Sequence, residues 1–117
     1  MIEELVSHVF ALRNAAHLAH WSTKSYSEHK ALGNLYDDLI DKIDNIVEAY
    51  QGYYGLIGEV RIMMMPKTHM ADLIRTELGW LQQNREKIAK KNTMIENLID
   101  DLMQTYSSTH YKLVNLK

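Results

Sequence analysis

Two histidines and two carboxylates between residues 20 and 48 are the residues of this chain whose types and spacing could do chemistry together. They are His20, His29, Asp44 and Glu48. Asp44 and Glu48 are four residues apart, so on an α-helix they lie on one face, one turn apart. At about 100° per residue, His29 falls within the same broad sector of that helix. Imidazole and carboxylate groups presented by the helices of a bundle are the ligands of non-haem iron and manganese sites.

The same sector of the predicted helix is also apolar, so the two acids border a buried face. Its apolar residues are Leu32, Leu39, Ile40, Ile43 and Val47. A carboxylate left unpaired in such a place is costly, and it needs a cation, a proton or a firm hydrogen-bond partner. Asp44 and Glu48 therefore have two readings besides ligation. They could continue the solvated acidic side of the helix, or form salt bridges across an interface.

Composition narrows the class of protein. A chain of 117 residues forms a single domain, residues 1–117, with one core. It has one proline and five glycines, which favours long helices. The net charge is −2 and no basic run exceeds Lys90-Lys91, so we predict no strong binding to duplex DNA. Cysteine is absent, which excludes a disulfide framework and thiolate metal ligands.

The sequence also bears on location. The first residues contain no basic region followed by an apolar stretch, so we expect no signal peptide. No window approaches 18 consecutive apolar residues, so we expect no membrane span. Together with the absence of cysteine, these observations predict a cytoplasmic protein.

Apolar residues recur at three- and four-residue spacing in four segments, which predicts four helices. The first runs over Ile2–Ser22 and turns His20 inward. The second follows Ser27 as its N-cap and ends among the glycines at 52–58. The third runs from near Thr68 to Lys90-Lys91, and Thr93 with Glu96 forms a capping box that opens the fourth. Such helices predict an all-α fold, an antiparallel four-helix bundle.

The sequence also predicts which residues of the third helix are buried and how His17 is held. We expect the third helix to bury Met70, Leu73, Ile74, Leu78, Leu81 and Ile88. His17 alone is interpreted as a partly buried ring bonded to a backbone carbonyl.

The connection before the third helix contains Met63, Met64 and Met65. Methionine clusters can bind soft copper, but consecutive side chains point in different directions, so we interpret this run as packing of the connection.

The spacing of these residues resembles a known family. The pair His20-Trp21, then His29, then Asp44 and Glu48 at 15 and 19 residues beyond His29, is similar to the mini-ferritins, the starvation-inducible DNA-binding proteins (Dps) of the ferritin-like superfamily. The end of the chain is also similar, with Asn92-Thr93 opening the last helix and His110-Tyr111 near its close.

This resemblance implies a ferritin-like fold and an iron site shared between two subunits across a two-fold axis. His20 and His29 would be ligands from one subunit, and Asp44 and Glu48 from the other. Iron, as a di-iron or a mononuclear centre, would be oxidised there by peroxide or oxygen, and Zn or Mn would be possible substitutes. No catalytic residue beyond the metal ligands is implied. Where the family has an acid one turn after the second histidine, this chain has Gly33, which predicts one ligand fewer.

The resemblance and the second helix both predict a homo-oligomer. The second helix has apolar or aromatic residues on more than one side, so we expect at least a dimer. The connection from the second to the third helix is too short for the extra helix of the family, so we do not expect its twelve-subunit cage.

Two other functions remain open. One is a helical oligomer without catalytic activity, whose surface serves a structural or interaction role. The other is a magnesium-dependent all-α nucleotide pyrophosphatase, in which acids on two helices hold the metal. It would require Glu96, Asp100 and Asp101 to face Asp44 and Glu48.

Overall fold

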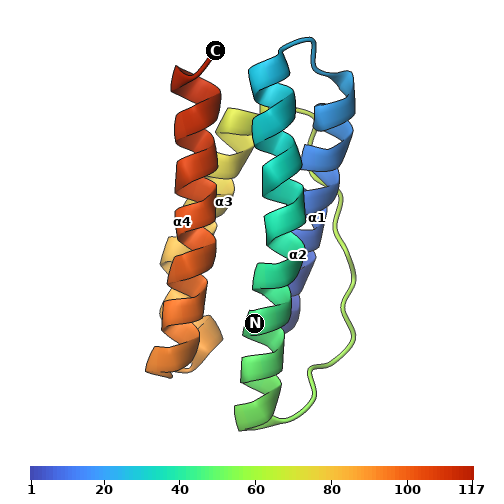
Figure 1. Ribbon diagram of the computed structural model, residues 1–117. Coiled ribbons are helices and arrows are strands. Elements are labelled where there is room, and N and C mark those ends of the chain that lie inside the picture. Colours follow the sequence, from blue (N-terminus) through green and yellow to red (C-terminus); the bar gives the residue numbers. More distant parts are fainter.

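The computed structural model describes all 117 residues and contains four α-helices and no strand (Figure 1). The helices are α1 (Ile2–Ser22), α2 (Tyr26–Tyr54), α3 (Met70–Ala89) and α4 (Thr93–Asn115). Two short turns join α1 to α2 and α3 to α4, and residues 55–69 connect α2 to α3 without helix or strand. The predicted all-α bundle is confirmed.

The direction of the chain follows from the long connection. α1 and α2 run in opposite directions, and residues 55–69 then return along the length of the bundle beside α1 (Figure 1). α3 therefore runs parallel to α2, and α4 reverses again. Each helix packs against two neighbours, in the pairs α1–α2, α1–α3, α2–α4 and α3–α4, and all four pairs are antiparallel. One long crossover is also the connectivity of ferritin-like bundles.

A single cluster of 22 buried apolar residues from all four helices forms the core. The stripe predicted for α3 is buried with one exception. Leu78 is only half-buried, and the preceding Glu77 is buried in its place. On α2, Ile40 is 37% exposed and is not part of the core cluster. None of the four helices is both long and apolar enough to cross a membrane.

Two helix starts lie earlier in the sequence than predicted. Ser25, not Ser27, caps α2, because its hydroxyl accepts a hydrogen bond from the backbone N–H of Glu28 at 3.3 Å. At α4 the side chain of Asn92 accepts from the N–H of Ile95 at 3.2 Å, so Thr93 is the first helical residue. In both cases two neighbouring polar residues could serve as the cap, and spacing alone does not separate them.

Side chains of α1 hold the first part of the crossing segment. The carboxylate of Glu3 accepts a hydrogen bond from the N–H of Gly58 at 2.7 Å, which lowers the pKa of that carboxyl. The hydroxyl of Ser7 donates to the carbonyl of Arg61 at 2.7 Å and accepts from the N–H of Met63 at 3.0 Å. Residues 64–68 make no hydrogen bond to the rest of the chain.

Candidate metal site

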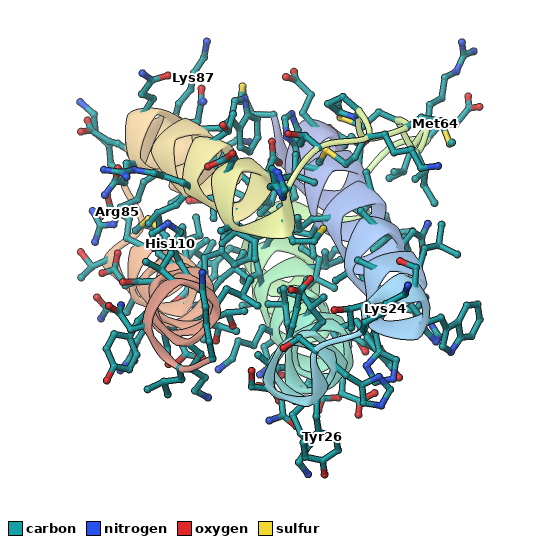
Figure 2. All side chains as sticks on the ribbon, turned by 90° about the horizontal axis from the view of Figure 1, so that it is seen from above. Lys24, Tyr26, Met64, Arg85, Lys87 and His110 are labelled. Carbon is teal, nitrogen blue, oxygen red and sulfur yellow. The ribbon has the colours of Figure 1, made fainter.

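His20 and His29 meet where α1 turns into α2. The chain reverses there over three residues, Thr23–Ser25, so the last turn of α1 lies beside the first turn of α2. The two imidazole rings are stacked, with centroids 3.7 Å apart and planes at 16°. Lys24 and Tyr26 mark this end of the bundle in Figure 2. The structure thus brings together the two histidines that the sequence singled out.

Each ring is held by the backbone of the other residue. His20 Nδ1 lies 2.6 Å from the carbonyl oxygen of His29, and His29 Nδ1 lies 2.7 Å from the carbonyl oxygen of His20. Because a carbonyl only accepts, both rings carry their proton on Nδ1 when neutral. Nε2 of each ring is then a lone-pair donor. Neither Nε2 has a hydrogen-bond partner in the chain, and neither is buried from solvent.

This arrangement is the one that metal-ligating histidines usually have. A backbone carbonyl that accepts from one ring nitrogen fixes the tautomer and the ring orientation, and it makes the other nitrogen a better ligand. Here both rings have that support before any metal arrives. Two imidazoles alone are an incomplete ligand set, and no group of three or more histidine, aspartate, glutamate or cysteine side chains in the chain could hold a metal ion.

Gly33 allows the ring of His20 to lie against α2. A Cβ atom built on Gly33 would stand 3.0 Å from Cε1 and 3.2 Å from Nδ1 of His20. Any side chain at this position would therefore push the ring outward. The Dps resemblance places an acid at the position of Gly33. In this chain the imidazole of His20 occupies the space beside that position. A carboxylate side chain introduced at position 33 would therefore meet the ring of His20.

An aromatic layer continues from the histidine pair along the outer side of α1 and α2. The ring of His17 stacks on Tyr36, with centroids 4.0 Å apart, and lies 4.4 Å from Trp21. The guanidinium carbon of Arg13 lies 5.4 Å from the centre of the Tyr36 ring. His17 makes no hydrogen bond to a backbone carbonyl, so its expected role was wrong. The ring is held by stacking instead.

Asp44 and Glu48 lie far from the histidines of their own chain. At 1.5 Å per residue they stand about 22 and 28 Å along α2 from His29. Both side chains are exposed, and neither forms a hydrogen bond or an ion pair within the chain. The four predicted ligands therefore form two separate pairs within one chain.

The acids of α4 are paired with cations. Arg85 binds Asp100 through two hydrogen bonds of 2.6 and 2.8 Å and reaches Glu96 at 3.1 Å. Lys42 lies 2.6 Å from Asp101. The guanidinium of Arg85 lowers the pKa of Asp100 through the hydrogen bond and its charge. These acids are engaged by cations, and no group of three or more acids in the chain could hold a metal ion, so the four-carboxylate site that a magnesium-dependent pyrophosphatase needs is not assembled.

A buried polar cluster escaped the sequence reasoning. Glu77 of α3 is 6% exposed, and its carboxylate lies 2.7 Å from His8 Nδ1 on α1. The ring of His8 stacks on Trp80 with centroids 3.8 Å apart. Burial and the nearby charge of Glu77 raise the pKa of Tyr106. The sequence did contain a signal that Glu77 is buried. This residue lies four residues from both Leu73 and Leu81, so it shares their apolar helix face.

Known proteins give the chain a family but no activity. Among curated proteins, an uncharacterized 14.6 kDa protein in the mobD-ri intergenic region of Enterobacteria phage T4 is 30% identical over 111 residues, covering 95% of this chain and 86% of the phage protein. No solved structure matches the chain. A family model matches residues 20–113, a range that includes both histidines, Asp44 and Glu48. By that match the chain belongs to the Family of unknown function (DUF5856).

Proposed function

We propose that this protein is a ferritin-like metal-binding bundle that holds iron between two copies of the chain. His20 and His29 would come from one copy, and Asp44 and Glu48 from the other. The observation that carries the proposal is the stacked histidine pair, with both Nδ1–H groups bonded to carbonyls and both Nε2 atoms facing solvent. The single long crossover of the bundle supports the ferritin-like comparison.

A second copy is needed because one chain separates the two ligand pairs. If two α2 helices pack antiparallel about a two-fold axis near residue 37, residue 29 of one copy lies opposite residue 45 of the other. His29 then faces the turn between Asp44 and Glu48. Ile40, 37% exposed, would lie close to the axis and become covered. Lys30 would approach the acidic half of the partner helix, so the charges would be complementary.

The residues fit Fe(II) as a substrate. Carboxylate oxygens stabilise Fe(III) more than Fe(II), and neutral imidazoles complete the ligand sphere without adding charge. Each Fe(II) would give up one electron, and hydrogen peroxide accepting two such electrons with two protons would leave as two molecules of water. Molecular oxygen is the alternative oxidant. With no acid at Gly33, we expect weak binding and slow oxidation, in the cytoplasmic location predicted from the sequence.

The test is metal binding by variants that remove one half of the shared site. Zn(II) serves as a redox-inert probe in calorimetry, and Fe(II) oxidation is followed by absorbance. We expect His29→Ala and Asp44→Asn each to abolish binding. Mixing the two variants should restore binding, because each mixed dimer contains one intact site. Anomalous density from Zn(II) in a soaked crystal would locate the ion.

Two outcomes would contradict the proposal. One is wild-type protein that binds neither metal, and the other is a pair of variants that bind as wild type does. Failure of the mixture to recover binding would refute the shared site in particular. Light scattering that finds a monomer with metal present would do the same.

The same two hydrogen bonds also support a second function, in which the histidine pair has a purely structural role. Because both rings are already bonded within the chain, the pair could act only as a clasp between α1 and α2 in an inert helical oligomer. In that case chelators and added metals leave the stability of the wild type unchanged, whereas His29→Ala lowers it. Stabilisation by Zn(II) that is lost in Asp44→Asn separates the metal site from the clasp.

A further inference from the structure

A groove of about 1060 Å³ lies between α1, the α1–α2 turn, the end of the crossing segment and the first turn of α3. Four of the seven methionines of the chain line it, Met63, Met64, Met65 and Met70. His69 also lines the groove. The three consecutive methionines, expected to diverge, therefore all border one space. In Figure 2 Met64 lies on the crossing segment, beside α1.

The crossing segment is held only in part where it carries these side chains, and Met65 packs against the core. Gly58, Arg61 and Met63 are tied to α1 by hydrogen bonds, but residues 64–68 make none. Methionine itself has three rotatable bonds and adapts to irregular spaces. Met63 and Met64 are 41% and 90% exposed, and His69 is also exposed. Their donor atoms can therefore converge on an ion without breaking a hydrogen bond.

The donor atoms of the groove select a soft cation. Thioether sulfur binds Cu(I) well, and imidazole suits copper as a further ligand, whereas hard ions such as Mg²⁺ and Ca²⁺ require oxygen. Glu28 is the one carboxylate among the lining residues. The chain has no cysteine, so no thiolate competes for the ion.

We propose that this groove is a binding site for Cu(I), with the thioethers of Met63, Met64 and Met65 and the imidazole of His69 as ligands. The groove reaches the α1–α2 turn, but neither His20 nor His29 lines it, so this proposal does not depend on the function proposed for that pair. No oxidation or reduction is involved, because the cation enters and leaves as Cu(I).

Trp21 provides a reporter for occupancy of the groove. It lines the groove and is 68% exposed, whereas Trp80 is stacked on His8. A cation held by the neighbouring sulfurs should change the fluorescence of Trp21 and leave that of Trp80 unaffected. The Trp21→Phe variant should therefore lose the fluorescence response but keep the binding seen by mass spectrometry.

Ag(I) in chloride-free buffer is the probe, because it shares the ligand preference of Cu(I) and does not change oxidation state. We expect one Ag(I) per chain in native mass spectrometry. Replacing Met63, Met64 and Met65 together by leucine keeps the apolar volume and removes the sulfur. That triple variant should bind Ag(I) at least tenfold more weakly. The matched control is Met94→Leu with Met103→Leu, outside the groove, which should bind as wild type does.

Two results would overturn the proposal, namely wild type that does not bind Ag(I), or a triple leucine variant that binds it as tightly as wild type. Circular dichroism establishes that each variant is folded. In wild type labelled with ¹³C at the methionine methyl groups, Ag(I) should shift the signals of the groove methionines and leave those of Met94 and Met103 in place. The His29→Ala variant should keep its Ag(I), and loss of it there would move the site to the histidine pair.

Discussion

Replacing Gly33 by alanine tests the geometry of the histidine pair. Glycine inside a helix costs about 1 kcal/mol relative to alanine, so the substitution alone should stabilise α2 by that amount. Its new Cβ, however, would stand 3.0 Å from Cε1 of His20, and the ring must give by a few tenths of an ångström. Such a shift strains two reciprocal hydrogen bonds, each worth about 0.5–1.5 kcal/mol net. Loss of both bonds would cost about 2 kcal/mol against the gain of about 1 kcal/mol in helix propensity, so we expect Gly33→Ala to lower the free energy of unfolding by about 1 kcal/mol.

The matched control is Gly79→Ala in the interior of α3, where a Cβ would meet nothing within 4 Å. That variant should raise the free energy of unfolding by about 1 kcal/mol, measured by urea denaturation followed by circular dichroism. In a background that already carries His20→Ala, Gly33→Ala should become stabilising as well, because no ring remains to be displaced. If Gly33→Ala stabilises the wild type as much as Gly79→Ala does, the described contact between ring and helix is wrong.

Three other predictions concern stability. Asn92→Ala should cost about 1 kcal/mol and Thr93→Ala much less, and equal losses in urea denaturation would contradict the capping assignment. His8→Ala leaves the buried carboxylate of Glu77 without its partner and should lower the free energy of unfolding by about 3 kcal/mol in the same assay. A loss below about 1 kcal/mol would show that the pair contributes little to stability. The lowered pKa of Asp100 means that its pairing with Arg85 stabilises the fold above the ordinary pKa of 3.8 and is lost as the pH falls through the lowered value. The stability difference between wild type and Arg85→Met should therefore be constant from about pH 7 to 5 and shrink below about pH 4, and a difference that grows on acidification would contradict this sign.

The sequence predicted the helices well because their burial is periodic. The apolar residues of α1 can be recognised from their spacing alone. The bounds of the helix, Ile2–Ser22, agree with the prediction. Helix starts were less well determined because the cap depends on which of two adjacent polar side chains reaches the free N–H groups. Glu77 was missed for a related reason. A buried helix face is predicted from its apolar residues. A buried acid on that face can be predicted only if its partner, here His8, is also predicted to be buried there.

The histidine pair was predictable in its members but not in its geometry. His20 and His29 were expected at one site, and the structure brings them together. Their reciprocal bonds depend on the tight turn between α1 and α2, and the contact with Gly33 depends on how closely the two helices approach. Neither is encoded in residue spacing. From the sequence Gly33 was interpreted as a missing ligand, whereas in the fold it makes room for the ring of His20.

The separation of the histidine pair from Asp44 and Glu48 has a physical consequence for assembly. Asp44 and Glu48 are exposed without a cation, on a face that also exposes Ile40, so nothing within the chain compensates for covering them. Water does so in a monomer, and a second copy could replace that water only if it brought cations or metal to these carboxylates. In an antiparallel dimer the pair His20 and His29 of the second copy would lie opposite these acids, and its two Nε2 atoms have no partner within the chain. Metal would therefore favour the dimer, and dimer formation should strengthen as Zn(II) is added and weaken again in chelator.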